Sequence, residues 1–194
     1  MSYSDKLFWQ QLDQIVSVIP KPYVDALLAL HDKLDEKNLR WIVDGDLSEC
    51  MHVVQIVPKC IEIVTSKDDA QKFFQAVQEF DPSSISLQTC QLQRNAIVDG
   101  NEYPVYVRSF CFNFTLNTVL VKVQGDLQFK VADWNWGEIY DFEPEYVNIV
   151  GMRIAVTPLE IKLQLYQSLG WTDRSEKIEP IVQKIRTLKN FKTR

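Results

Sequence analysis

The sequence predicts an α+β domain in which a mixed β-sheet has its helices on one side and further helices lie at both ends. Apolar residues recur at helical spacing before residue 39 and after residue 157, and they alternate as in strands over most of the segment between. Hydrophobic residues make up 46% and charged residues 24% of the 194 residues, as in globular domains, which excludes general disorder. We therefore expect a single domain over 1–194, with N-terminal helices (1–38), a sheet core (39–157) and C-terminal helices (158–194).

The N-terminal part predicts two helices. Apolar side chains recur at helical spacing after Ser4, and Pro20 ends that pattern. A second helix is expected from Pro22, because proline suits the first helical turn. The apolar face of this helix carries Val24, Leu27, Leu28, His31 and Leu34. His31 on that face is either a core-edge side chain with a local partner or a functional base.

The segment from 39 to 80 predicts strand, turn, helix, strand and helix in that order. Leu39–Val43 is a short β-prone run, and the polar turn Asp44-Gly45-Asp46 separates it from a short helix. A second strand is expected over Cys60–Val64. Ser66 and Asp69 then have the spacing of a capping box, so an amphipathic helix should follow.

Residues 85 to 132 predict an antiparallel meander, because apolar residues alternate and turn signals interrupt them at 99–101, at Asn117 and at 124–126. A hairpin is expected across Gly151-Met152. The run Thr157-Pro158-Leu159-Glu160 has the pattern of a helix start, and a last helical stripe ends the chain.

Charge and cysteine content exclude several functional classes. The chain has 21 Lys and Arg against 26 Asp and Glu, a net charge of −5, which disfavours gripping extended nucleic acid. No apolar run is long enough to span a membrane, and the N-terminus lacks an apolar signal core. Four separate cysteines and two histidines disfavour a zinc site or a disulfide framework. We expect a cytoplasmic protein, and nothing in the sequence indicates its oligomeric state.

The predicted strand at Cys60–Val64 is the most informative for chemistry. Cys60, Glu62 and Val64 share one face of it, because side chains two residues apart return to the same face. Two carboxylates at this spacing can share Mg²⁺ ions, and a glycine turn before a helix can cradle phosphates.

These elements, taken in order, resemble the nucleotidyltransferase superfamily with the polymerase-beta-like fold, and especially its small antibiotic-type members. In that family a strand leads to a Gly-Gly or Gly-Ser turn, the next strand carries Asp-x-Asp, and a third carboxylate follows on a later strand. Here Trp41–Leu47 corresponds to the turn, Cys60–Ile63 to the Asp-x-Asp strand and Val121–Asp126 to the third-carboxylate strand. Thr157-Pro158-Leu159-Glu160 and the later Gly170–Arg174 resemble the C-terminal part of those enzymes. The resemblance implies a nucleotidyltransferase-like fold over residues 24 to 188.

This chain departs from the family at the metal ligands. Cys60 replaces the first carboxylate, Glu62 is one methylene longer than the second, and Lys122 stands at the third. A thiol is a soft ligand that suits Mg²⁺ poorly. Asp46, in place of the second small turn residue, would repel a triphosphate. We therefore expect a Glu62–Lys122 ion pair to replace the metal electrostatically.

The resemblance assigns candidate roles, and two residues occur in more than one role. Glu62, Lys122 and Asp46 are the candidate catalytic residues, and Glu62 with Asp44 the candidate metal ligands. The candidate nucleotide-binding residues are Gly45, Asp46, Leu47 and Ser48. Asp44 and Asp46 can equally serve as turn and N-cap residues. Alternatively, Asp44, Asp46 and Glu62, with Asp126, could form a displaced acidic metal cluster.

The segment from Trp134 to Tyr146 is dense in aromatic and acidic residues. Trp134, Trp136 and Tyr140 could stack on a base or dock a partner protein. The alternative is a loop that folds over the core and buries its own aromatic rings.

Three functions follow as expectations. The first is a nucleotidyltransferase-fold protein that binds a nucleotide or a partner after losing or remodelling its metal-dependent transfer chemistry. The second is an active, Mg²⁺-dependent transferase that moves a nucleotidyl group from a nucleoside triphosphate to an unknown acceptor. The third is an interaction scaffold that uses Trp134–Tyr146.

Overall fold

The fold is seen in a computed structural model that describes residues 19–192, so the helix expected after Ser4 lies outside the described residues. The helices are α2 (Lys21–Leu34), α3 (Gly45–Met51), α4 (Lys67–Ala76), α5 (Leu159–Ser168) and α6 (Thr172–Lys192). The strands are β1 (Ile42–Asp44), β2 (Ile61–Thr65), β3 (Ser86–Gln91), β4 (Ala96–Val98), β5 (Asn101–Tyr103), β6 (Val105–Leu116), β7 (Val119–Val131), β8 (Glu145–Ile149) and β9 (Met152–Val156). None of the helices in this described part has the length and apolar character that crossing a membrane requires.

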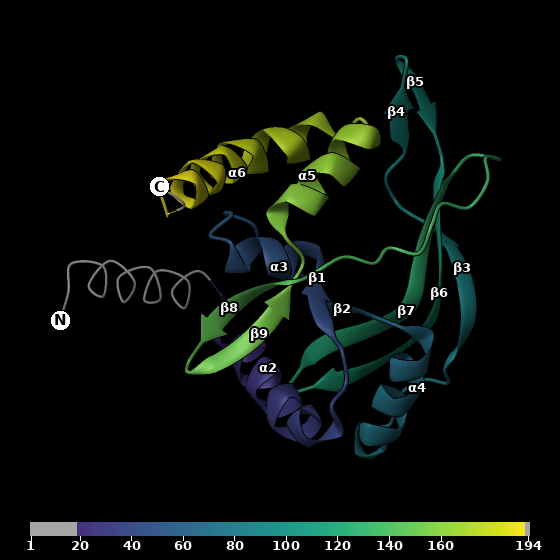
Figure 1. Ribbon diagram of the computed structural model, residues 1–194. Helices are drawn as coiled ribbons and strands as arrows, with labels where there is room; N and C mark the ends of the chain where they lie inside the picture. The colour runs from purple at the N-terminus through teal and green to yellow at the C-terminus, as the bar shows by residue number, and fades with distance from the viewer. Residues whose placement is uncertain (1–18, 193–194) are drawn as a thin grey trace.

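Seven strands form one mixed sheet in the order β3-β6-β7-β2-β1-β9-β8, and β4 with β5 forms a separate hairpin (Figure 1). β2 runs parallel to β7, and β1 runs parallel to β9, whereas β1 and β2 are antiparallel. The α+β class with a mixed sheet is thereby confirmed. This order puts the turn after β1 beside the beginning of β2 and the beginning of β7.

Helices α2, α3 and α4 share a core with one face of the sheet. In this cluster Leu27, Leu47 and Phe73 pack with buried strand residues such as Ile61 and Phe112. The helices form because their apolar positions recur at helical spacing, and Ser66 caps α4 by accepting a hydrogen bond from the Asp69 backbone N–H at 3.1 Å. These predicted elements are therefore confirmed.

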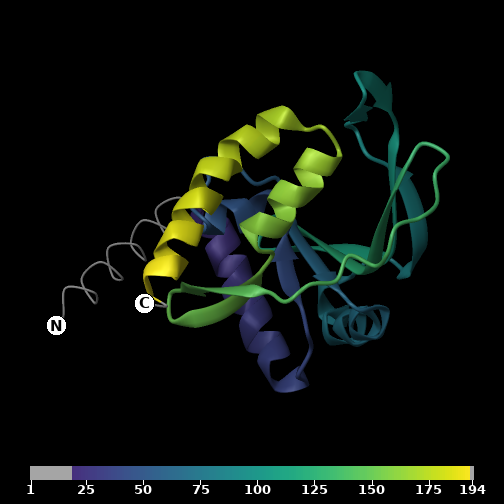
Figure 2. The same ribbon diagram turned by 45° about the horizontal axis from the view of Figure 1, so that its top comes forward.

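Helices α5 and α6 pack against each other through a separate cluster, which includes Leu163, Tyr166, Ile178 and Val182. They lie next to α3, on the side where the chain leaves β1 and β9 (Figure 2). Two parallel strands thus deliver α3 and α5 to the same end of the sheet. This arrangement allows side chains of α5 and α6 to reach the turn after β1.

One predicted break in the sheet is wrong. The sequence indicates a turn at 124–126, but β7 continues through it with a bulge, where the pairing with β6 shifts between Arg108 and Phe110. Gly125 is required here, because an added Cβ would lie 2.9 Å from the Ala70 Cβ on α4. Asp126 has φ +51° and accepts a hydrogen bond from the Lys67 backbone N–H at 2.9 Å, which helps to cap α4.

Candidate functional site

The turn that joins β1 to α3 has the predicted strand–turn–helix geometry. Gly45 has φ +64°, a left-handed conformation that glycine adopts without strain. The Glu62 carboxylate lies directly against this glycine: a Cβ added at Gly45 would come within 2.1 Å of Glu62 Oε2. Glycine is therefore needed here for its backbone conformation and for the close approach of an anionic side chain. Asp44 is the N-cap residue of α3, but its side chain makes no capping hydrogen bond.

Sheet register places the candidate residues of three strands side by side. Asp44 on β1 is the Cα partner of Glu62 on β2, and Glu62 is the Cα partner of Lys122 on β7. The strands are thus neighbours as the resemblance implies. The expected ion pair does not form, because Lys122 is exposed and its ammonium group is not within 4.0 Å of the Glu62 carboxylate.

A different lysine neutralises the site. Lys162 on α5 is 3% exposed, and its Nζ lies 3.0 Å from Asp44 Oδ1 and 3.6 Å from Glu49 Oε1. It also donates a hydrogen bond to the Gly45 backbone C=O at 3.0 Å. A single buried ammonium group therefore binds both the end of β1 and the first turn of α3.

Arg174 on α6 extends this network. Its guanidinium group lies 2.9 Å from Asp46 Oδ1 and 3.3 Å from Glu49 Oε2. Glu49 is 1% exposed and also accepts a hydrogen bond from the Tyr166 hydroxyl. Every oxygen of this buried carboxylate thus has a partner, which burial of a charge requires. We call Asp44, Asp46, Glu49, Lys162 and Arg174 the ion-pair network.

Lys162, Glu49 and Arg174 are site residues that the sequence patterns did not indicate. A local signal existed for the lysine: Leu159, Leu163 and Tyr166 are buried on α5, so Lys162 lies on the apolar face of that helix. A lysine on such a face needs a buried anionic partner.

Electrostatics follow from this packing. Burial raises the pKa of Glu62, and the nearby Asp44 carboxylate raises it further, whereas Lys122 and Lys162 lower it. Burial lowers the pKa of Lys162, but the charges of Asp44 and its other neighbours outweigh that effect and hold it well above its ordinary value. Lys162 therefore stays charged, and Glu62 retains its proton to higher pH than an exposed glutamate.

The four candidate nucleotide-binding residues offer few free side-chain groups. Leu47 is 0% exposed, and the buried Ser48 donates its hydroxyl to the Gly45 backbone C=O at 3.0 Å. Asp46 is in ion-pair contact with Arg174. A phosphate at this turn would therefore have to use backbone N–H groups.

Cys60 is buried at the start of β2. Its Sγ lies 3.7 Å from Glu62 Oε1, and burial together with that carboxylate raises the pKa of the thiol to about 11. A thiol with such a pKa is protonated at neutral pH, so it is a poor nucleophile and a poor metal ligand.

The residues at the turn do not fit a Mg²⁺ ion. The available anionic donors are Asp44 and Glu62, and the Asp44 oxygen contacts the Lys162 ammonium group. Among residues 19–192, no group of three or more His, Cys, Asp and Glu side chains could hold a metal ion. Mg²⁺ prefers several oxygen ligands, and an ammonium group in contact with one of those oxygens would repel the metal ion.

The segment between β7 and β8 covers the sheet face opposite α2 and α4. Tyr140 and Phe142 pack there with Val64 and Leu127, and their rings meet edge to face at 4.9 Å. The Tyr140 hydroxyl is buried without a hydrogen-bond partner in the described structure. Burial raises its pKa most, and the negative charge of Asp44 raises it further. Tyr140 therefore lies over the candidate site.

The two tryptophans of this segment have other surroundings. Trp134 is 53% exposed, and its ring lies 6.3 Å from that of Tyr103. Trp136 lies under the Arg108 guanidinium group at 4.5 Å and the Lys130 ammonium group at 5.4 Å. Of the three candidate stacking residues, Tyr140 belongs to the apolar cluster on the sheet, Trp136 lies against charged side chains of β6 and β7, and Trp134 is exposed.

Comparison with known proteins identifies the fold. No protein-family model and no curated protein sequence matches the chain. The crystal structure of a "putative nucleotidyltransferase" from Thermotoga maritima matches with a TM-score of 0.61 and 22% sequence identity, covering 86% of this chain and 96% of that one. ANT(2")-Ia in complex with adenylyl-2"-tobramycin matches more distantly, with a TM-score of 0.44, 11% identity and coverage of 78% and 77%. The first likeness establishes a nucleotidyltransferase-like fold, as the sequence predicted, and the second is too distant to support a conclusion.

Proposed function

We propose that this nucleotidyltransferase-fold chain has lost metal-dependent nucleotidyl transfer and acts by binding a nucleotide or a partner. The observation that carries the proposal is the position of Lys162, whose ammonium group contacts Asp44 at 3.0 Å, Glu49 at 3.6 Å and the Gly45 C=O at 3.0 Å. A fixed cation at this point offsets the negative charge that a metal ion would otherwise neutralise.

The surroundings of Gly45 support the same proposal. The Glu62 carboxylate already lies against this glycine, where it would oppose the approach of a triphosphate. Lys122 at the position of the third carboxylate adds a cation where a metal needs an anion.

A labelled-transfer assay tests this proposal. The chain is incubated with labelled ATP or GTP, with and without Mg²⁺, and calorimetric titrations measure nucleotide binding under the same conditions. We expect no transfer and no effect of Mg²⁺ on binding. Mg²⁺-dependent transfer that disappears in Glu62→Gln would contradict the proposal, because that variant keeps the shape and removes the carboxylate.

An active Mg²⁺-dependent transferase is the second candidate. It is favoured by the closeness of three acidic residues, because the charges of Asp44 and Asp46 both raise the pKa of Glu62. In that case Lys162 would have to move away from Asp44 when the metal binds. The same assay decides between the two candidates.

Partner binding through Trp134–Tyr146 is the third candidate. Trp134 and Ile139 are large apolar side chains with 53% and 49% exposure. If no nucleotide binds, we expect the double variant Trp134→Ala/Ile139→Ser to bind the protein partner more weakly than the wild type does. An unchanged affinity of this variant for the partner would contradict the candidate.

A further inference from the structure

A pocket of about 330 Å³ lies away from the turn at Gly45. It is bounded by the C-terminal end of α2, the residues that lead into β1, the segment before β8 and the edge of β9. Ile42 forms part of its lining at the start of β1, whereas Gly45 follows the end of that strand. The volume is at the lower end of the range for small-ligand sites.

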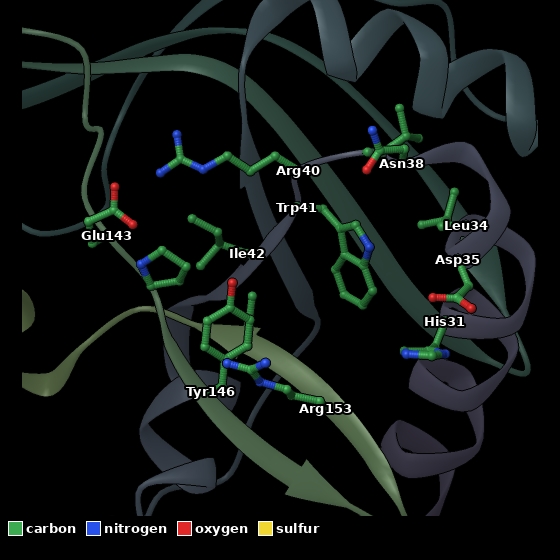
Figure 3. Close-up of a pocket in the computed structure, with 13 residues that line it drawn as sticks. His31, Leu34, Asp35, Asn38, Arg40, Trp41, Ile42, Glu143, Tyr146 and Arg153 are labelled. Carbon is green, nitrogen blue, oxygen red and sulfur yellow. The ribbon is translucent and has the colours of Figure 1, made fainter.

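Two aromatic rings line this pocket. Trp41 and Tyr146 both line it, and the Trp41 indole lies between the Tyr146 ring and α2 (Figure 3). The Arg153 guanidinium group lies 3.9 Å from the Tyr146 ring centroid. Leu34, Ile42 and other apolar side chains complete the lining. Planar rings with an apolar floor suit a flat ligand.

Polar groups surround these rings. His31, Asp35, Asn38 and Glu143 line the pocket, and none of their side chains makes a hydrogen bond or ion pair with another side chain described in 19–187, position 36 aside. They contrast with the ion-pair network, in which every charged side chain has a partner. Within the described part of the chain, the side-chain hydrogen-bonding capacity at this pocket is therefore not used by other residues.

The charges decide which flat ligand fits. Arg40 also lines the pocket, but its guanidinium group is already in contact with Asp141 at 2.8 Å and with the Phe142 C=O at 2.6 Å. Asp35 and Glu143 then outnumber Arg153, which favours a ligand without negative charge. Carboxylates and Asn side chains accept hydrogen bonds from the exocyclic amines of cytosine and adenine.

We propose that this pocket binds a neutral, amino-bearing nucleoside of the adenosine or cytidine type, stacked against Trp41 and Tyr146. The site differs from the turn at Gly45, so the proposal goes beyond the proposed function and does not depend on it. The Asp35 and Glu143 carboxylates disfavour the corresponding nucleotide, because a phosphate adds negative charge.

Titration calorimetry with adenosine, cytidine, inosine and AMP tests the proposal on the full chain without metal. We expect adenosine or cytidine to bind, with inosine and AMP at least about fivefold weaker. Tyr146→Ala should weaken binding about fivefold or more, the lower end for loss of one stacking ring. Folding is not at risk in this variant, because the Tyr146 ring is 53% exposed.

Leu87→Ala is the control, because Leu87 is similarly exposed at 59% and lies outside the pocket. It should leave nucleoside affinity unchanged, whereas Glu143→Gln should weaken adenosine binding and narrow its advantage over AMP. The proposal is overturned if neither adenosine nor cytidine binds at millimolar concentration, if AMP binds as tightly, or if Tyr146→Ala has no effect. Transfer activity in the assay above would leave this conclusion unchanged.

Discussion

Replacement of Lys162 by methionine removes the central cation of the ion-pair network and keeps a similar side-chain length. Its Nζ lies 3.0 Å from Asp44 and 3.6 Å from Glu49, and each such pair contributes about 5 kcal/mol at an effective dielectric constant of roughly 20. Desolvation of the ions offsets part of this attraction. Removing one partner of a buried pair costs about 3–5 kcal/mol, because the remaining charge is left uncompensated. We expect Lys162→Met to lower the free energy of unfolding by about that amount at pH 7.

Urea denaturation followed by circular dichroism measures this loss. The matched control is Lys122→Met, because Lys122 is an exposed lysine at the same sheet region and should cost less than about 0.5 kcal/mol. Asp44→Asn in the Lys162→Met background should cost less than in the wild type, because the carboxylate it removes no longer has a cation.

A loss under about 1 kcal/mol for Lys162→Met, or one no larger than that for Lys122→Met, would refute the central role of Lys162, because leaving a buried carboxylate uncompensated destabilises the fold by more than that. Additive effects of Asp44→Asn and Lys162→Met would also contradict it, since residues in ionic contact should couple.

Three further predictions concern the same turn. Gly45→Ala should destabilise the protein by about 2 kcal/mol or more from its left-handed backbone and the contact with Glu62, and the Glu62→Ala background should remove part of that loss; equal losses in both backgrounds, by urea denaturation, would argue against the contact. The folded state holds the Glu62 proton more tightly than the unfolded state does. The stability of the wild type relative to Glu62→Gln should therefore fall as pH rises from 4.5 through the raised pKa of Glu62. Thermal melting of both proteins measures this difference, and an increase of it with pH would contradict the prediction. Iodoacetamide at pH 7.5 should label the exposed Cys90 before the buried Cys60, as mass spectrometry of the native protein would detect; early labelling of Cys60 would show a reactive thiolate.

Local patterns predicted most of the helices and strands, because their apolar faces are set by spacing within each element. The α4 helix is an example, since Ser66 and its apolar stripe mark it before any tertiary contact is considered. The break predicted at 124–126 is wrong for a tertiary reason. Gly125 is there to let α4 approach β7, and Asp126 serves as a cap for α4, so both turn-like residues belong to a bulged strand.

The candidate site was predicted in part. Glu62 and Lys122 were expected to be neighbours, and the sheet register places them so. Their ion pair does not form: Lys122 is exposed, and the cation that contacts the neighbouring Asp44 is Lys162 of α5, 117 positions beyond Gly45. Local periodicity does not identify which residue a side chain pairs with across such a separation. Only the burial of a lysine among leucines on α5 hinted at it.

The cover over the sheet illustrates the same limit. Aromatic density in 134–146 predicts either a ligand surface or a loop that buries its own rings. Tyr140 and Phe142 are packed on the sheet, whereas Trp134 stays half exposed. Composition does not distinguish these rings, because their environments depend on which strand residues they meet.

Anomalous diffraction tests most directly whether an ammonium group has taken the place of the metal. Crystals are soaked with Mn²⁺ and a nucleoside triphosphate, and the anomalous scattering of manganese is recorded. We expect no manganese between Asp44 and Glu62, and we expect the Lys162 Nζ still to contact the Asp44 carboxylate. A manganese ion bound by both carboxylates, with Lys162 displaced from them, would contradict it.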